Sequence, residues 1–483
     1  MYKIVKSSLL RPNFALRFYP KPRSISSEDA NKIQKYKDLN SKERKEENDP
    51  SITRKFGPTD GKFPKFTEYA IVGGGVMGSA IAYSMKQRAP NSFQLMVVER
   101  DPKYTRSSTA HSVGGIRQQF SLPENIQLSM YGVEFLKNIK QHLSVSGDDP
   151  PEVQFQPNGY LFLASEEGAE QMVQNHKIQK ELGAKVELLR PKQLSLKFPW
   201  LNLDGIEMGS YGFENEGWFD PWALLCAFKK KAVSLGANYV HGEVIGFEFE
   251  DKSYIADDTI DPTIRTHRMY VKDEVGEVHS VEFGNLVITA GPYSGDVVKM
   301  LHDGLGPEFL KIPLPVEPRK RYVYVINCEK GPGKDMPLTI DPTGTYARPE
   351  GFSGKYLCGR SPLSNEEPDV SSLEVDYDFF QKSVWPALAY RIPAFEAVKV
   401  SSAWAGYYDY NTFDQNALFG AHPYFPNVFF ATGFSGHGIQ MAPAIGRAMT
   451  ELLLDKAYVT IDMSRFHLYR VFKEEPLYEQ NIV

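Results

Sequence analysis

The sequence predicts an α/β fold whose first ordered domain is a Rossmann-like three-layer arrangement of parallel strands and helices. The main observation is a short apolar segment, residues 69–72, that runs directly into a glycine-rich stretch, residues 73–78, and then into a helical pattern. A second apolar segment, residues 93–98, ends at Glu99. A strand, a tight glycine turn, a helix and a second strand form the beginning of a doubly wound sheet.

The later elements follow from similar patterns. Residues 126–143 have the spacing of a long amphipathic helix, and another helix begins at Asp220 and Pro221 and ends at Gly236. Residues 286–291 and 428–433 are apolar segments that end in glycine turns, typical of buried strands. A helix from about residue 442 to 454 follows the second of them. Residues 252–281 are polar and irregular, and we expect a hairpin insertion there.

Length and composition exclude several classes of protein. A chain of 483 residues with 42% hydrophobic and 24% charged residues is expected to form more than one globular domain. The net charge of −5 comes with no basic run, so we expect no nucleic-acid partner. No apolar run reaches the roughly 18 to 20 residues of a membrane helix, so we expect no integral membrane segment. Cys226, Cys328 and Cys358 form no CxxC pair, and we expect no metal site.

The N-terminus is expected to direct the protein to mitochondria. Residues 1–27 are rich in lysine, arginine and serine, contain no acidic residue, and have no continuous apolar centre. This composition is typical of a mitochondrial presequence, and the alternative is a disordered basic tail. Residues 28–61 are mostly charged and polar, which predicts a disordered linker before the first strand. A location in the matrix, or on the matrix face of the inner membrane, follows from this interpretation.

The glycine turn and Glu99 predict a dinucleotide site. Gly73, Gly75 and Gly78 let the backbone turn sharply, approach a pyrophosphate and pack the next helix against the strand. Glu99 lies about 20 residues after Gly78 at the end of the second strand, where a carboxylate accepts hydrogen bonds from ribose hydroxyls. A chance glycine turn beside a surface glutamate is the alternative. NAD and FAD share this pattern.

Two other segments favour FAD. Residues 107–117 follow Glu99 and are mostly small, so they can pass along a pyrophosphate and a flavin ring. Residues 431–440, which read ATGFSGHGIQ, lead into a helix near the C-terminus. Free amides and a helix N-terminus aimed at the flavin ring would stabilise the negative charge of its reduced form.

These motifs resemble the family that includes D-amino-acid oxidase, sarcosine oxidase and dimethylglycine dehydrogenase, over roughly residues 66–460. The resemblance implies oxidation of a secondary or tertiary amine at a C–N bond, with hydride transfer to flavin N5. It also implies a discontinuous FAD-binding domain and an α+β substrate domain on a largely antiparallel sheet. The implied ranges are 66–150, 220–305 and 400–460 for the first domain, 151–219 and 306–399 for the second, and 461–483 for a C-terminal tail.

The resemblance assigns residues to the cofactor and to catalysis. The expected FAD contacts are Gly73, Gly74, Gly75, Val76, Met77, Gly78, Glu99, Arg100, Ser108, Thr109, Val244, Ala290, Gly291, Gly433, Gly436, His437, Gly438 and Ile439. The candidate catalytic residues are His111, Arg117, Tyr408 and Gln440.

Two positions bear on covalent attachment of the flavin. Sarcosine oxidases attach it through a cysteine, and the matching position here is Gly406, so that link is absent. Dimethylglycine dehydrogenases use a histidine in a T-x-H-x-x-G segment, which residues 109–114 match in spacing, so His111 is a candidate for a covalent link. The alternative, which we favour, is a polar histidine that packs near the ring without a bond.

The substrate-binding cations of the family are not all present. Gln440 stands where sarcosine oxidase has a lysine, and Phe120 stands where it has an arginine, while Arg117 matches a neighbouring arginine near the flavin. This difference puts an amino-acid substrate in doubt. Aromatic residues between Trp404 and Phe413 could line an amine pocket, although such clusters more often belong to a core. The triplet Arg319, Lys320 and Arg321 could contact the flavin or a substrate acid, but alternate side chains of a strand face opposite sides, and we expect solvated surface for at least one of them.

Longer motifs, such as residues 114–129 and 403–416, resemble one mitochondrial member of the family that is linked to assembly of respiratory complex I. This resemblance implies complex I subunits or assembly intermediates as partners, beside a small amine substrate. Two functions are therefore open: an oxidoreductase that acts in complex I assembly, or a non-catalytic assembly factor that binds FAD structurally.

Overall fold

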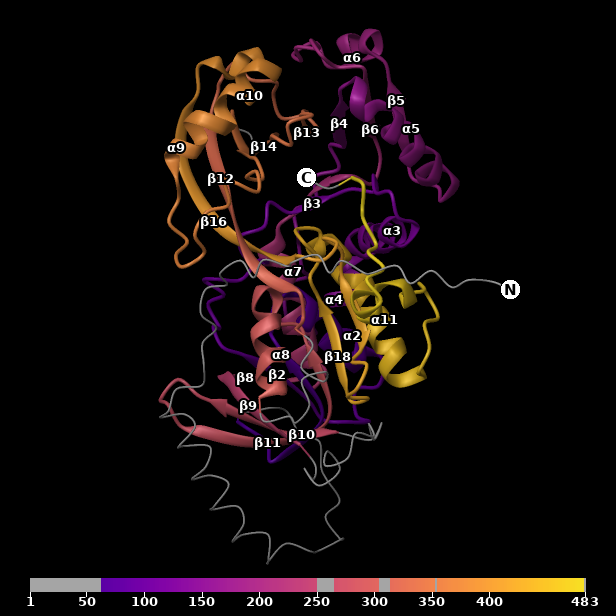
Figure 1. The fold of residues 1–483 in the computed structure, drawn as a ribbon, viewed down its shortest axis with the longest axis vertical. Helices are drawn as coiled ribbons and strands as arrows, with labels where there is room; N and C mark the ends of the chain where they lie inside the picture. The colour runs from indigo at the N-terminus through magenta and orange to yellow at the C-terminus, as the bar shows by residue number, and fades with distance from the viewer. Residues whose placement is uncertain (1–61, 250–264, 304–312, 352–353, 482–483) are drawn as a thin grey trace, which may run out of the picture.

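The computed structural model describes residues 62–249, 265–303, 313–351 and 354–481, and within them the strands form two eight-stranded sheets and one two-stranded ribbon. Figure 1 shows one sheet in the lower half of the molecule and the other in the upper half. The expected presequence, residues 1–27, and the expected linker, residues 28–61, lie outside the described residues. So do residues 252–264 of the segment expected to be an irregular hairpin insertion over residues 252–281, whose described part forms strand β10 (Thr266–Lys272) and the start of β11 (Val278–Ile288), an antiparallel pair.

The lower sheet contains the predicted parallel strands. Its order is β17-β18-β11-β1-β2-β8, and every neighbouring pair from β18 to β8 is parallel, whereas β17 is antiparallel to β18. These strands are β1 (Phe66–Val72), β2 (Leu95–Glu99), β8 (Asn238–His241), β11 (Val278–Ile288), β17 (Leu418–Ala421) and β18 (Val428–Thr432). A parallel sheet is covered on both faces, which explains why its strands are continuous apolar runs.

Alternate side chains of these strands enter two separate cores. Ile71 and Val97 face a core shared with the helices, while Val72 and Val98 face a core on the opposite side. The helical layer consists of α2 (Val76–Arg88), α3 (Pro123–Lys137), α4 (Ile139–Leu143), α7 (Pro221–Ser234) and α11 (Gly438–Asp455). The opposite layer consists of β9 (Glu243–Phe249), β10 (Thr266–Lys272), the first half of β11 and α8 (Ser294–His302). The predicted three-layer fold is confirmed.

Two predicted helices differ in their bounds. The single helix expected over residues 126–143 is two helices, α3 and α4, because the backbone leaves the helical conformation at Asn138. Helix α11 begins at Gly438, immediately after the glycine loop, and not at about residue 442. The earlier start places the N-terminus of this helix next to the loop that the sequence assigned to the cofactor.

The upper sheet is largely antiparallel, as expected. Its order is β16-β12-β15-β14-β13-β4-β6-β5, and the pair β13–β4 is parallel. The strands are β4 (Tyr160–Ala164), β5 (Val186–Leu189), β6 (Met208–Gly212), β12 (Val316–Asn327), β13 (Leu338–Ile340), β14 (Tyr346–Glu350), β15 (Lys355–Gly359) and β16 (Lys399–Asn411). Around it lie α5 (Glu166–Glu181), α6 (Pro191–Lys197), α9 (Tyr377–Phe379) and α10 (Trp385–Arg391), and β3 (Gly115–Ile116) pairs with β7 (Gly217–Trp218) below.

The expected boundary at residue 400 does not match the strand pairing. β16 pairs with β12 from Asn411 opposite Val316 to Lys399 opposite Asn327, so residues 399–411 belong to the upper sheet. After β16, the chain returns to the lower sheet at β17. The ribbon of β12 and β16 also connects the two halves, because Val316 packs in the core of the lower sheet and Tyr324 in that of the upper sheet.

The C-terminal tail is folded onto the body over its described residues, up to 481. It contains a short helix, α12 (Tyr469–Phe472), whose Arg470 makes a buried ion pair with Asp414 at 2.7 Å. In the described parts of the chain, no helix combines the length and the apolar character needed to cross a membrane.

Candidate functional site

A cavity of about 540 Å³ lies between the carboxyl ends of the lower parallel strands and the inner face of the upper sheet. Ligands of doubly wound sheets bind at this edge. Most of the residues assigned from the sequence line it: Gly73, Gly75, Val76, Met77, Glu99, Arg100, Ser108, Thr109, His111, Arg117, Val244, Ala290, Gly291, Tyr408, Gly436, His437, Gly438, Ile439 and Gln440. Gly74, Gly78 and Gly433 are not among the lining residues, and they act through the backbone instead.

The glycine turn between β1 and α2 admits no side chain at two positions. Gly73 has φ +105°, and a Cβ atom there would lie 2.4 Å from the carbonyl oxygen of Thr289. A Cβ atom on Gly78 would lie 2.0 Å from the carbonyl oxygen of Gly73. The turn can therefore be this tight only with glycine, and it brings the N-terminus of α2 to the cavity.

Glu99 is held at the end of β2 by backbone amides. Its Oε2 accepts a hydrogen bond from the Gly74 amide at 2.8 Å, and its Oε1 accepts one from the Asp101 amide at 2.9 Å. Burial raises the pKa of Glu99 above its usual value, although the two hydrogen bonds oppose part of this shift. A carboxylate oxygen accepts more than one hydrogen bond, so both oxygens can also accept from the two hydroxyls of a ribose.

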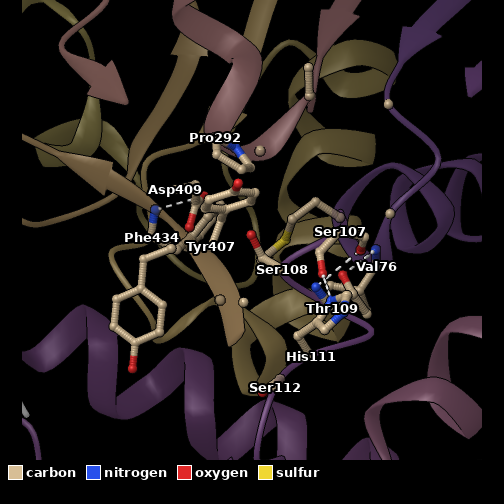
Figure 2. Close-up of a pocket in the computed structure, with 18 of the residues that line it drawn as sticks. Val76, Ser107, Ser108, Thr109, His111, Ser112, Pro292, Tyr407, Asp409 and Phe434 are labelled. Atoms are coloured by element: carbon tan, nitrogen blue, oxygen red, sulfur yellow. Dashed lines mark hydrogen bonds between the residues drawn. The ribbon is translucent and has the colours of Figure 1, made fainter. Parts of the chain in front are cut away.

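The segment after β2 lies across the turn. The Thr109 hydroxyl accepts a hydrogen bond from the Val76 amide at 3.2 Å, and the Thr109 amide donates to Ser107 Oγ at 3.1 Å. Figure 2 shows Ser107, Thr109 and His111 gathered on one side of the cavity. The hydroxyl of Ser108 is buried and has no hydrogen-bond partner in the described protein. A buried orphan hydroxyl beside a cradle of glycines fits a ligand with phosphate or ribose oxygens.

His111 occupies the space that a side chain at position 406 would need. Its Nδ1 lies 2.8 Å from the carbonyl oxygen of Ser107. A Cβ atom on Gly406 would lie 2.6 Å from the Cβ atom of His111. Gly406, at the position that matches the attachment cysteine of sarcosine oxidases, therefore leaves the space that His111 fills, and both residues line the cavity.

The C-terminal glycine loop closes the cavity from the other side. Gly436 has φ +97°, and a Cβ atom there would lie 2.5 Å from the ring of Tyr408. The Phe434 amide donates to Asp409 Oδ2 at 3.0 Å, as Figure 2 shows, and burial raises the pKa of Asp409 to about 6. Burial, together with the charge of Arg117, lowers the pKa of His437 to about 3, so its imidazole is neutral near pH 7.

Arg117 and Gln440 meet at the inner end of the cavity. Gln440 Oε1 accepts hydrogen bonds from the Arg117 amide at 2.8 Å and from the Ser129 hydroxyl at 3.1 Å. The guanidinium of Arg117 is buried, which lowers its pKa, and it donates to the carbonyl oxygens of Gln119 and Asn481. Phe120, in the place of a family arginine, is fully buried, with its ring centre 4.1 Å from that guanidinium.

Several lining residues were not assigned from the sequence. Tyr160, Leu338, Ile340 and Tyr346 come from β4, β13 and β14, and Arg321 comes from β12. The triplet 319–321 was a possible contact, and of its members only Arg321 is among the lining residues; Arg319 and Arg321 both reach Glu367, whereas Lys320 donates to the Ser372 carbonyl oxygen. Nothing in the local pattern marks the tyrosines.

Of the aromatic group expected between Trp404 and Phe413, Tyr407 and Tyr408 line the cavity. Tyr407 also accepts a hydrogen bond from Arg106 at 3.0 Å and donates to the Val370 carbonyl oxygen at 2.7 Å. Trp404 donates to the His111 carbonyl oxygen at 3.0 Å. The group therefore combines lining and structural roles.

Comparison with known proteins identifies the family. The family model described as FAD dependent oxidoreductase (DAO) matches residues 68–452. The chain is 51% identical over 435 residues to FAD-dependent oxidoreductase domain-containing protein 1 of Xenopus laevis, covering 89% of this chain and 87% of that protein. It is 25% identical over 417 residues to glycine oxidase of Bacillus subtilis strain 168, covering 84% and 98%. L-proline dehydrogenase from P. horikoshii has a similar fold, with a TM-score of 0.70 at 24% identity over 86% of this chain and 100% of that one. The chain therefore belongs to the DAO family of FAD-dependent oxidoreductases.

Proposed function

We propose that this FAD-dependent oxidoreductase oxidises a secondary or tertiary amine at a C–N bond. The observation that carries the proposal is the continuity of the cavity. It runs from the glycine turn and Glu99, which suit a dinucleotide, to a wall of tyrosines on the upper sheet, which suits a small amine. When bound, FAD would supply the hydride acceptor for the carbon beside the amine nitrogen, and water would hydrolyse the resulting iminium to a carbonyl compound and a free amine, with release of a proton.

The residues of the chain would bind the cofactor at three places. Glu99 would accept hydrogen bonds from the ribose, and the turn at Gly73–Gly78 with the N-terminus of α2 would face the pyrophosphate. The N-terminus of α11 and the cationic Arg117 would stabilise negative charge on the ring.

The wall of the cavity would keep the amine unprotonated. Burial raises the pKa of Tyr160, Tyr346 and Tyr408, so these side chains are neutral phenols near pH 7. Arg117 places positive charge beside them, and a like charge disfavours protonation of an amine nitrogen. An unprotonated nitrogen has the free electron pair that hydride loss from the adjacent carbon requires.

Flavin binding and turnover can be measured separately. The purified protein is reconstituted with FAD, freed of oxygen, and mixed with a panel of secondary and tertiary amines. Bleaching of the oxidised flavin absorbance is the expected result, while a coloured protein that no amine bleaches would contradict the catalytic proposal. A protein that folds but stays colourless would remove the flavin site itself.

We favour a non-covalent flavin beside His111. The contact from His111 Nδ1 to the Ser107 carbonyl oxygen supports a packing role for this residue. Acid precipitation of the loaded protein should give a colourless pellet and a yellow supernatant. Yellow colour in the pellet that is lost in a His111→Ala variant would show a covalent link instead.

A second function, as an assembly factor for respiratory complex I in mitochondria, is favoured by the state of Gln440 and Arg321. Gln440 Oε1 already accepts two hydrogen bonds, and Arg321 makes two hydrogen bonds of 3.0 Å with Glu367. Arg321 is therefore paired with a carboxylate of the protein, and Gln440 brings no positive charge for a substrate carboxylate, so the fold could be kept for FAD-dependent binding of partners rather than turnover. The composition of residues 1–27 supports import into the matrix.

This second function has its own test. Cells that lack the protein are complemented with the wild type, with a Glu99→Ala variant and with a chain without residues 1–27, and complex I assembly intermediates are measured. Only the wild type is expected to restore assembly in mitochondria. Full restoration by the chain without residues 1–27 would exclude the proposed presequence.

A further inference from the structure

The described end of the tail, residues 477–481, lies beneath the inner end of the cavity. Figure 1 shows this segment, in yellow, rising from the region of α11 toward the upper sheet. Glu479 is only 5% exposed although it carries a carboxylate. It accepts hydrogen bonds from the Ser121 amide at 2.6 Å, the Leu122 amide at 3.2 Å and Asn125 Nδ2 at 3.0 Å. A buried carboxylate with this many donors is a firm anchor.

Glu479 holds the start of helix α3 from a distant part of the chain. Leu122 is the N-cap residue of α3, and it provides no side-chain hydrogen bond to the first turn. The Glu479 carboxylate accepts from the amides of Ser121 and Leu122, which precede the first turn, and from the Asn125 side chain within it, at the end of the helix where a negative charge is favourable. The position of the tail is therefore linked to the start of α3, whose Ser129 donates to the Arg117 carbonyl oxygen at 2.6 Å.

The same anchor fixes Asn481, which contacts Arg117. Glu479 Oε1 also accepts a hydrogen bond from the Asn481 amide at 3.1 Å. The Asn481 carbonyl oxygen accepts from Arg117 Nη2 at 2.6 Å, and Asn481 Nδ2 donates to the Gln119 carbonyl oxygen at 2.5 Å. Gln119 in turn accepts from Arg117 Nη1 at 2.5 Å. The two Nη atoms of Arg117 thus donate to different segments: Nη2 to Asn481 of the tail, and Nη1 to Gln119 of the segment after β3.

The type of acceptor matters for the charge in the cavity. Arg321 is neutralised by the carboxylate of Glu367, whereas Arg117 is held by two neutral carbonyl oxygens. A carbonyl orients a guanidinium without cancelling its charge, so Arg117 keeps a positive charge at the cavity with no direct ion pair in the described protein, although the carboxyl groups of Glu479 and Glu216 lie near enough to interact with it. Leu477 packs in the hydrophobic core, whereas Gln480 and Asn481 line a second cavity of about 270 Å³, so the last described residues depend on the Glu479 anchor more than on close packing.

We propose that residues 477–481 are a positioning segment for the flavin site, in which Glu479 and Asn481 hold the guanidinium of Arg117 where it stabilises negative charge on the ring. This inference rests on the proposed binding of FAD. Glu479 and Asn481 act through Arg117 and are positioning residues, not catalytic ones.

The first experiment needs no cofactor. Labelling of Arg117 by phenylglyoxal is followed by peptide mass spectrometry in the full chain, in Glu479→Ala and in a chain that ends at Tyr478. Glu475→Ala is the matched control, because Glu475 is an exposed glutamate of the same tail. Arg268, which is 4% exposed and ion-paired within the lower half, reports general unfolding. At least fivefold faster labelling of Arg117, with Arg268 and the control unchanged, is expected; equal rates for Arg117 would overturn the proposal.

The second experiment uses the FAD-loaded protein and sulfite, which adds to the flavin ring to give an anionic product. Loss of the positioned charge should weaken sulfite binding at least tenfold in Glu479→Ala and in the shortened chain, with the flavin content unchanged. Unchanged sulfite affinity, despite faster labelling of Arg117, would overturn the link between the tail and the flavin. If the wild type takes up no FAD, the proposed function fails, and the labelling experiment still decides whether the tail holds Arg117.

Discussion

The two ends of the cavity differ in how their polar groups are used. At the nucleotide end, formed by Gly73, Glu99 and Ser108, the Ser108 hydroxyl is buried and has no partner in the described protein, and the glycine turn brings backbone rather than side chains to the cavity. At the ring end, formed by Arg117, Arg321 and Gln440, the two guanidinium groups and the Gln440 side-chain oxygen already form hydrogen bonds with other parts of the protein. The nucleotide end is therefore shaped for a ligand, while the ring end is shaped largely by its own contacts.

This difference separates cofactor binding from substrate selection. An end with free polar groups and open space gains hydrogen bonds when a ligand arrives, whereas an end with satisfied groups must break some to admit a new partner. We therefore expect changes at the nucleotide end to act on FAD affinity. Changes at the ring end should act on stability, on pH dependence and on the charge of the ligands that enter.

The largest effect is expected from Glu216, which lies behind the ring end. It is fully buried, accepts a hydrogen bond from the Gln118 amide at 2.9 Å, and burial raises its pKa from 4.5 to about 8. The folded state keeps this proton between these two pH values, while the unfolded chain releases it. Stability should therefore fall as pH rises through this window, by on the order of 5 kcal/mol, and level off above it.

The Glu216→Gln variant isolates this contribution. Glutamine does not titrate, so the variant should lose much less stability than the wild type between pH 5 and pH 8. Urea unfolding of both proteins across this range measures the difference, in which contributions from other buried acids cancel. Parallel pH profiles would show that Glu216 is ionised in the folded protein.

The next effect concerns the backbone of the nucleotide end. A Gly78→Ala change places a methyl group 2.0 Å from the Gly73 carbonyl oxygen, and both belong to the backbone of one turn. We expect a loss of about 3 kcal/mol in unfolding free energy, because neither atom can move without opening the turn. Gly168→Ala in α5 is the control, since its Cβ atom would meet Ala164 at an ordinary 3.5 Å. Equal stability of the two variants would contradict the tight turn.

A smaller effect is expected when Glu99 is changed without altering its shape. Glu99→Gln replaces an acceptor oxygen with an amide nitrogen and removes the charge that ribose hydroxyls would meet. FAD affinity should fall roughly thirtyfold, equivalent to about 2 kcal/mol. Fluorescence titration of the apoprotein measures it, with the exposed Glu207→Gln as control. If both variants bind FAD equally well, the carboxylate has no role in recognition.

The smallest effect would show whether the ring end can be opened to anions. Glu367→Gln removes the charge that neutralises Arg321, whose side chain is 11% exposed. Binding of acetate to the FAD-loaded protein, followed by the change in flavin absorbance, should become about threefold tighter, or about 0.7 kcal/mol. The neighbouring Glu366→Gln, at an exposed position, should leave it unchanged. Weaker acetate binding in Glu367→Gln would show that the pair serves another purpose.

The nucleotide end could be predicted because its parts are close in sequence. A strand, a glycine turn, a helix and Glu99 follow one another within one stretch, and Gly78 must be glycine because of the Gly73 carbonyl oxygen in the same turn. At the ring end, the family resemblance pointed to Arg117, Tyr408 and Gln440, which line the cavity, but Tyr160 and Tyr346 were missed because they come from distant elements. Their meeting depends on sheet order and on the register that sets Arg321 opposite Gly406. The contact from Asn481 to Arg117 depends on where a tail folds back, which no periodicity encodes.

The long ribbon of β12 and β16 has a mechanical consequence. Its lower end is part of one hydrophobic core and its upper end is part of the other, so neither half can lose its packing without pulling on strands that the other half needs. A protein joined in this way should melt in one calorimetric transition, in contrast to two lobes on a hinge, which melt in turn. Substrate entry should then rely on the loops at the cavity mouth rather than on separation of the lobes.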